Sequence, residues 1–224
     1  FTLLDGKLSK NNKTISIGDC FDLSKKEDDF LFNKKSLLLE TKINDEEISV
    51  SDAILNILSN KNINEIFLVP GDTNLHLMDA IGRNENINYF SFQKEDSAAF
   101  AALASSKLTN KISVLCISAG SSAARIIEAL TSAFIDSEPL LVISGQAISS
   151  YKNNKLRQTG NKSINIKKIV GSITKYMAVI ENENSIGYHI NQALYLSKIG
   201  RPGPCWIDIP INFLGKKNFS GFAN

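Results

Sequence analysis

One junction decides the fold, and it lies in the run Asn88-Tyr-Phe-Ser-Phe-Gln-Lys-Glu-Asp-Ser-Ala-Ala-Phe100. The apolar, strand-like residues 87–92 lead into an Ala-rich, helix-like stretch over residues 97–108. Glu95 stands between the two. This carboxylate fits two interpretations: an acid that stabilises the first turn of a helix, or a functional group placed where a strand ends.

From residue 48 onward, short apolar stretches alternate with stretches of helical periodicity. Strands are predicted at residues 66–69, 88–92, 112–117, 140–144 and 205–209. Helices are predicted around residues 53–58 with Ser51 as the cap, and at 75–81, 97–108, 123–135 and 185–198. Strands that are apolar on both faces are typical of a parallel sheet buried between helix layers. The pattern predicts an α/β fold with a three-layer, doubly wound, mostly parallel sheet.

Ligands of such sheets bind at the carboxyl ends of the strands. Pro70 with Gly71, Glu95, Gly120 and Gln146 each follow a predicted strand directly. Four strand ends therefore point to one edge, as a binding site there requires. Two of these positions also have plain structural interpretations, because Pro70-Gly71 fits a simple turn and Gln146 fits a side chain that hydrogen-bonds loop backbone.

Composition excludes several classes of protein. The 224 residues are 43% hydrophobic and 21% charged, with a net charge of +2, as in ordinary soluble globular proteins. The lysines form no long basic tract, and no apolar stretch approaches the roughly 20 residues of a membrane span, so neither a nucleic-acid nor a membrane partner is expected. The three cysteines lack the spacing of a disulfide framework, which favours a reducing, cytoplasmic location.

The chain is predicted to have three parts. Residues 1–46 are rich in Lys, Asn, Asp and Ser, and we expect an N-terminal extension of unknown role with a short strand or two. Residues 47–212 form the main domain. Residues 213–224 are read as the start of a linker to a missing domain, and the first residue, Phe1, fits a piece of a longer protein.

Six segments around the Glu95 junction resemble, in order, the N-terminal pyrimidine-binding domain of thiamine-diphosphate enzymes, with acetolactate synthase large subunits as the nearest kind. The resemblance extends from about residue 48 to about residue 213. The segments are Ile66-Phe-Leu-Val-Pro-Gly-Asp72, Cys116-Ile-Ser-Ala-Gly-Ser-Ser-Ala-Ala-Arg125, Ala133-Phe-Ile-Asp-Ser-Glu-Pro-Leu-Leu-Val-Ile-Ser-Gly-Gln146, Leu156-Arg-Gln-Thr-Gly160, Ile173-Thr-Lys-Tyr176 and Gly200-Arg-Pro-Gly-Pro-Cys-Trp-Ile-Asp-Ile-Pro210.

The resemblance implies thiamine diphosphate as the cofactor and the thiamine-diphosphate-binding fold. Glu95 takes the place of the catalytic carboxylate that is hydrogen-bonded to the pyrimidine N1′, and Pro70, Gly71, Gly120 and Gln146 take places beside the cofactor. The family holds the diphosphate and its Mg²⁺ through a Gly-Asp-Gly segment followed by Asn, which this sequence lacks. We therefore expect no metal ligand in this chain, with Mg²⁺ bound by a domain absent from it.

The sequence also departs from the family pattern. Ala119-Gly-Ser-Ser-Ala-Ala-Arg125 stands where relatives usually have Ser-Gly-Pro-Gly-Ala-Thr-Asn, and Lys162-Ser163 replaces a typical Gln-Glu. Asp96 replaces a common glutamine. These changes suggest a substrate other than pyruvate pairs, or a partly degenerate site.

Three functions remain open. The leading hypothesis is an acetolactate-synthase-like enzyme that decarboxylates a 2-oxo acid and transfers the acyl carbanion to an acceptor. Its partners would be the diphosphate-binding domain of a second subunit and further copies in a homo-oligomer. The alternatives are a subunit of a split 2-oxo acid decarboxylase, or a non-catalytic binding or oligomerisation module.

Overall fold

The computed structural model describes residues 48–149, 158 and 162–217, together with the backbone of three short strands near the N-terminus. The chain divides into two compact units, Phe1–Glu46 with Asn224, and Glu47–Ala223. In the first unit the three strands pair antiparallel in the order β2-β1-β3, and they are β1 (Leu8–Lys10), β2 (Lys13–Ile15) and β3 (Leu31–Phe32). The Leu156–Gly160 motif lies outside the described residues, apart from Gln158.

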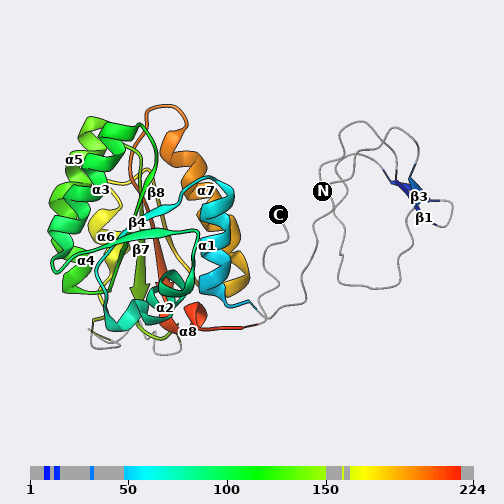
Figure 1. Ribbon diagram of the computed structural model, residues 1–224, viewed down its shortest axis with the longest axis horizontal. Coiled ribbons are helices and arrows are strands. Elements are labelled where there is room, and N and C mark those ends of the chain that lie inside the picture. The colour runs from blue at the N-terminus through cyan, green and yellow to red at the C-terminus, as the bar shows by residue number, and fades with distance from the viewer. Residues whose placement is uncertain are drawn as a thin grey trace. The chain divides into compact units, whose positions relative to one another are not determined.

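The second unit is built on a six-stranded, all-parallel sheet in the order β5-β4-β6-β7-β9-β8 (Figure 1). This confirms the predicted α/β class. Five strands were expected from the sequence, and β8 is the addition. The strands are β4 (Glu65–Leu68), β5 (Asn88–Ser91), β6 (Ser113–Ile117), β7 (Leu140–Gln146), β8 (Tyr176–Val179) and β9 (Cys205–Pro210).

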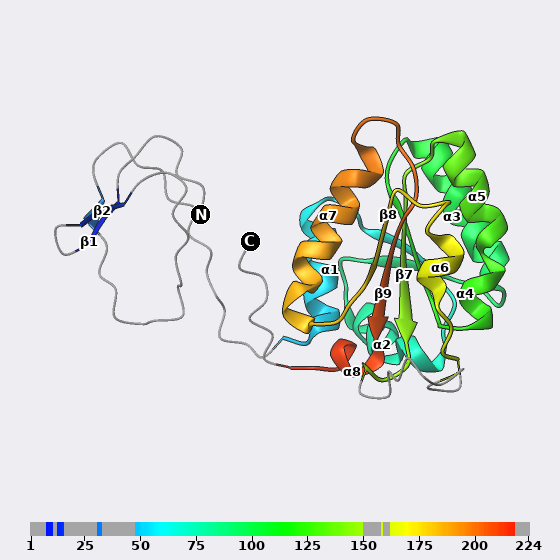
Figure 2. The same ribbon diagram turned by 180° about the vertical axis from the view of Figure 1, so that it is seen from behind.

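Helices cover both faces of this sheet, as the views from the front and from behind show (Figure 1, Figure 2). One face packs against α1 (Val50–Asn60), α2 (Leu75–Arg83), α7 (Ile186–Lys198) and α8 (Ile211–Leu214). The other face packs against α3 (Glu95–Thr109), α4 (Ser121–Arg125), α5 (Ile127–Asp136) and α6 (Ile166–Val170).

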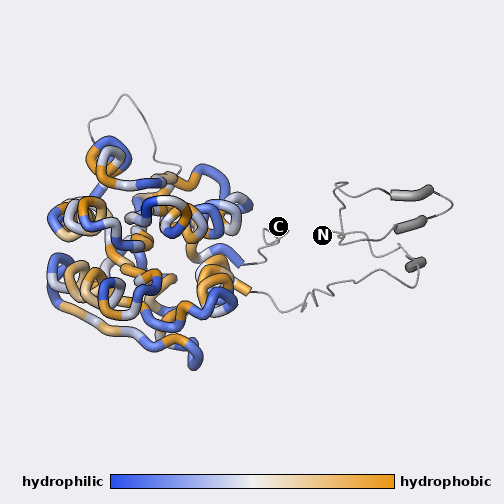
Figure 3. The backbone as a smooth tube through the Cα atoms, turned by 90° about the horizontal axis from the view of Figure 1, so that it is seen from above, coloured by the Kyte–Doolittle hydropathy of each residue, from blue (hydrophilic) through white to orange (hydrophobic). Residues whose placement is uncertain are grey.

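Alternation along the buried strands builds one core on each face. In β7, Leu141 and Ile143 join the α1 side, whereas Leu140 and Val142 join the α3 side. The helices are amphipathic, and hydrophobic and hydrophilic residues alternate along their turns (Figure 3). Within the described parts of this unit, every helix is too short or too polar to cross a membrane.

Several local expectations were wrong. The first helix is capped by Ser49, whose hydroxyl accepts from the Asp52 amide in a capping box, while the predicted cap Ser51 is buried and donates to the Leu214 carbonyl. The predicted helix over residues 123–135 is two helices, α4 and α5, which meet at Ile126. β5 is exposed along its length, because it forms an edge of the sheet.

Packing of the central strands predicts a matched pair of leucine variants. Leu115 lies in the middle of β6 and is fully buried, so Leu115→Ala should lower the free energy of unfolding by about 2–5 kcal/mol. Leu108 is 87% exposed, so Leu108→Ala should change it by less than about 0.5 kcal/mol. Urea titration measures both, and equal losses would contradict the assigned core.

Candidate functional site

The structure brings the five predicted site residues to one edge of the sheet, at the carboxyl ends of its strands. Pro70 and Gly71 follow β4, Gly120 precedes α4 as its N-cap, and Gln146 is the last residue of β7. Glu95 is the first residue of α3, so the helix begins two residues before the predicted start. Both sequence interpretations of Glu95 therefore describe its position, at a helix start and at a strand end.

The turns after β4 and β6 are packed directly on each other. A Cβ atom on Gly71 would lie 2.5 Å from the Ser118 Cβ, so only glycine permits this approach. The Thr73 and Ser118 hydroxyls are hydrogen-bonded at 2.8 Å, and the Ala119 amide donates to the Thr73 hydroxyl at 2.9 Å. A Cβ atom on Gly145 in β7 would overlap the Thr73 carbonyl. Three adjacent strand ends are thus locked together.

Asp72 and Lys162 form an ion pair above these turns. The Asp72 carboxylate accepts from Lys162 Nζ at 2.8 Å and from the Ser118 hydroxyl at 3.1 Å. The hydrogen bond from Lys162 is the main reason that the pKa of Asp72 lies below its ordinary value. Gly120 has a φ of +73°, and a Cβ atom there would lie 2.9 Å from the Lys162 carbonyl oxygen. Lys162, one of the departures from the family pattern, therefore packs against a predicted site residue.

Glu95 places a buried carboxylate at this edge. Its side chain is 12% exposed, and Arg125 Nη1 lies 3.7 Å from its Oε2. Within residues 48–149 and 162–217, no hydrogen-bond donor contacts the Glu95 carboxylate. A buried acceptor without a donor costs about 1–3 kcal/mol, so such groups are uncommon away from ligand sites. The arrangement leaves this carboxylate able to accept from a ligand N–H group.

Gln146 is held by a buried network on the β9 side of the edge. Its Nε2 donates to Asp208 at 2.8 Å, and its Oε1 accepts from the Ala147 amide at 2.9 Å. Ser144 donates to the same carboxylate at 2.5 Å and accepts from Trp206 Nε1 at 2.8 Å. Burial raises the pKa of Asp208 to about 6. These contacts match the structural interpretation of Gln146, and none of them links it to Glu95.

Sequence reasoning missed Asp208 and Arg125 as parts of this edge. The signal for Asp208 was a single acid inside the apolar strand of residues 205–209. Its partner Ser144 lies 64 residues earlier, so only the pairing of β7 with β9 shows the contact. In the described part of the chain, no group of three or more His, Cys, Asp or Glu side chains is placed to hold a metal ion.

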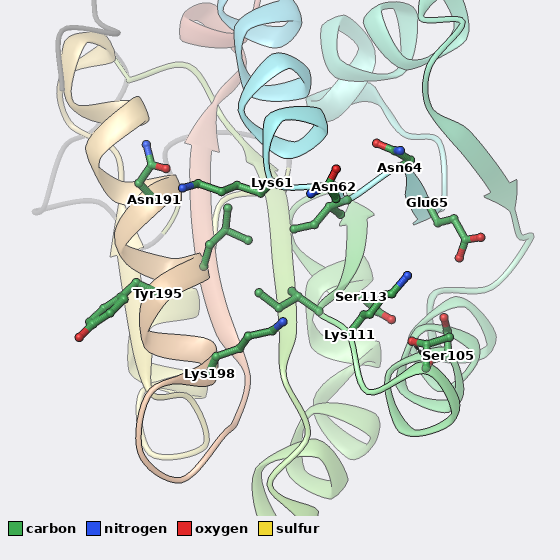
Figure 4. Close-up of a pocket in the computed structure, with 14 residues that line it drawn as sticks. Lys61, Asn62, Asn64, Glu65, Ser105, Lys111, Ser113, Asn191, Tyr195 and Lys198 are labelled. Atoms are coloured by element: carbon green, nitrogen blue, oxygen red, sulfur yellow. Dashed lines mark hydrogen bonds between the residues drawn. The ribbon is translucent and has the colours of Figure 1, made fainter. Parts of the chain in front are cut away.

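A separate cavity of about 660 Å³ lies at the opposite, amino-terminal edge of the sheet (Figure 4). Lys61, Lys111 and Lys198 line it near the carboxyl ends of α1, α3 and α7. Cations there offset the partial negative charge of helix ends. None of the predicted site residues lines this cavity, so it is not the site that the sequence predicts.

Comparisons with known proteins agree with the sequence and the fold. Residues 48–169 match the family described as "Thiamine pyrophosphate enzyme, N-terminal TPP binding domain". The chain is 29% identical over 177 residues to the acetolactate synthase large subunit of Buchnera aphidicola from Schizaphis graminum, covering 79% of this chain and 30% of that protein. It is 31% identical over 162 residues to the large subunit of Lactococcus lactis, covering 72% and 28%.

A solved structure shares the fold. The thiamine diphosphate-dependent 4-hydroxybenzoylformate decarboxylase of Rhodococcus jostii superposes with a TM-score of 0.69 at 19% identity, covering 75% of this chain and 31% of that one. This chain therefore spans less than a third of the length of these relatives.

The locked turns predict opposite effects for two glycine variants. Gly145→Ala should lower the free energy of unfolding by about 1–3 kcal/mol, because the added methyl group would overlap the Thr73 carbonyl. Gly82→Ala in α2 should raise it by about 0.5–1 kcal/mol, because nothing lies within 4 Å of the added methyl group and alanine favours a helix. Thermal or urea unfolding measures both, and a neutral Gly145→Ala would contradict the tight approach.

The buried Asp208 predicts a pH dependence of stability. Because its folded pKa of about 6 exceeds the ordinary 3.8, its contribution is fully present below about pH 4 and is lost as the pH rises through 6. The loss should be roughly 3 kcal/mol, from about 1.4 kcal/mol for each pH unit between the two values. Urea titrations from pH 4 to 7 should show this slope, and Asp208→Asn should flatten it. Asp79→Asn, at an exposed site, should leave the slope unchanged, and an equal slope in all three proteins would contradict the assignment.

Proposed function

We propose that this chain, which belongs to the family of thiamine pyrophosphate enzymes through its N-terminal TPP-binding domain, binds the pyrimidine end of thiamine diphosphate at the carboxyl edge of its sheet. One observation carries the proposal: within the described residues, the buried Glu95 carboxylate has no hydrogen-bond donor. A protonated pyrimidine nitrogen is a donor of the kind that this acceptor lacks. The residues present therefore fit the cofactor.

Each of the other site residues has a role in this proposal. Pro70 and Gly71 form the wall of the site beside the cofactor rings, on a turn that is fixed by its contact with Ser118. Gly120 opens α4, which leads to Arg125 beside Glu95. Gln146 stands at the rim, held in one orientation by Asp208. The locked strand ends give these groups fixed positions, which is what the protein contributes to cofactor catalysis.

The proposed reaction is decarboxylation of a 2-oxo acid with transfer of the acyl group to an acceptor. When bound, thiamine diphosphate supplies the carbon nucleophile for both steps. Glu95 holds and exchanges a proton at the pyrimidine N1′, since a carboxylate in this position can both accept and return it. The departures over residues 119–125 and at Lys162 favour a substrate other than a pair of pyruvate molecules.

The remaining half of the site would come from another domain. We propose that Mg²⁺ and the diphosphate are held by a diphosphate-binding domain of a second subunit, in a homo-oligomer of the whole protein. The relatives support this assignment of the diphosphate to another domain. More than two thirds of their length lies outside the region that this chain matches.

A non-catalytic binding module is the second candidate. The observation that favours it is the ion pair between Arg125 and Glu95, because this pair engages the carboxylate that turnover would need. The two candidates differ in one measurable way. Both predict cofactor binding, but only the enzyme predicts turnover.

Replacement of Glu95 tests the proposal in the whole protein, assembled with its diphosphate-binding domain and supplied with Mg²⁺. Glu95→Gln should lower carbon dioxide release from 2-oxo acids by about 10²–10⁴-fold, the range for loss of a proton-transfer group. Glu128→Gln is the matched control, because this acid also lies in the first turn of a helix, α5, but is exposed, and it should stay within about twofold of the unchanged protein.

Each outcome decides between the candidates. Turnover that is equal in the unchanged protein and in Glu95→Gln would contradict the catalytic role. Cofactor binding measured by calorimetry, without turnover on any 2-oxo acid, would favour the non-catalytic module. No cofactor binding at all would overturn both.

A further inference from the structure

We propose that Arg125 is a positioning residue that holds the Glu95 carboxylate before the cofactor binds, and that it then competes with the cofactor pyrimidine for this carboxylate. The inference rests on the proposed function. It adds to that function a residue from this chain that sets how tightly the cofactor is bound.

The side chains of Glu95 and Arg125 meet where one helix begins and another ends. Glu95 begins α3, and Arg125 ends the five-residue helix α4. The helices α3 and α4 contact each other, and Ala98 and Ala123 are both buried in the core on this face of the sheet. Arg125 Nη1 and Glu95 Oε2 are 3.7 Å apart, within ion-pair distance but too far for a good hydrogen bond.

The pair is asymmetric in exposure. The Glu95 side chain is 12% exposed, whereas that of Arg125 is 59% exposed. The carboxylate is therefore largely covered by the protein, whereas the mostly exposed guanidinium can swing into solvent. Arg125 can leave when a stronger donor arrives, and a pyrimidine N–H aligned with the carboxylate is a stronger donor than a cation at 3.7 Å. The ion pair therefore opposes cofactor binding without blocking it.

The size of the effect follows from the exposure of Arg125. Ion pairs with an exposed partner change an equilibrium by less than about fivefold at low salt, and salt weakens them. Breaking this pair should therefore tighten cofactor binding by about two- to fivefold. A purely structural role for Arg125 would produce no dependence on salt, so salt separates the two roles.

Calorimetric titration with thiamine diphosphate and Mg²⁺ tests the inference in the whole, assembled protein. Arg125→Gln should bind the cofactor about two- to fivefold more tightly at low salt, and the difference should fade near 1 M salt, where charges are screened within about 3 Å. Arg125→Lys keeps the charge and should bind like the unchanged protein. In a Glu95→Gln background, Arg125→Gln should have no effect, because the partner is gone.

Arg83→Gln is the matched control. The Arg83 side chain is 58% exposed and forms ion pairs with Asp79 and Asp52, on the opposite face of the sheet from Glu95. The Arg83→Gln variant removes the same charge as Arg125→Gln, so it measures the general effect of net charge on the binding of an anionic ligand. Its cofactor affinity should equal that of the unchanged protein.

Three results would overturn the inference. Weaker binding by Arg125→Gln would make Arg125 a ligand of the cofactor or substrate. Equal tightening in Arg83→Gln, or tightening that persists at high salt, would exclude a specific pair with Glu95. If the unchanged protein binds no thiamine diphosphate, the proposed function fails and the inference fails with it, whereas binding that Arg125→Gln leaves unaltered removes only the inference.

Discussion

The parallel pairing of β4, β6 and β7 is the constraint on which the rest of the structure depends. It places three strand ends side by side at one edge, and their turns must then fit together. Gly71 and Gly145 make this fit possible, because a side chain at either position would collide with Ser118 or Thr73. The Thr73 and Ser118 hydroxyls are themselves hydrogen-bonded at 2.8 Å, which holds the turns together. A rigid edge of this kind can hold a ligand in one orientation.

The same constraint explains why Glu95 is buried. Helix α3 packs across β4 and β6 on one face of the sheet, and its first residue is thereby carried to the locked edge. The helix start favours a negative charge there, which offsets part of the cost of burial. The structural and functional roles of Glu95 are therefore compatible. The helix start accommodates the carboxylate, and the carboxylate oxygens remain able to accept a hydrogen bond from a ligand.

Much of the fold could be predicted from the sequence, because apolar strands and helical periodicity are local patterns. The five predicted strands are present, and β8 was missed because Tyr176–Val179 is short and only partly buried at a sheet edge. The site was less predictable. Motifs placed Glu95 at a strand end, but the partners of Asp208 and Glu95 come from strands and helices that are distant in sequence. In the sequence, Arg125 was only a departure from the asparagine that relatives usually have at this position. The structure shows that α4 places it beside Glu95.

The most direct test is a crystal structure of the whole, assembled protein with thiamine diphosphate and Mg²⁺. The account predicts that the pyrimidine N1′ lies about 2.7–2.9 Å from a Glu95 carboxylate oxygen, the distance of a charge-assisted hydrogen bond, and that Arg125 has turned away from it. Gly71 should keep its place against Ser118. A cofactor bound elsewhere, with Glu95 still paired to Arg125, would contradict the account.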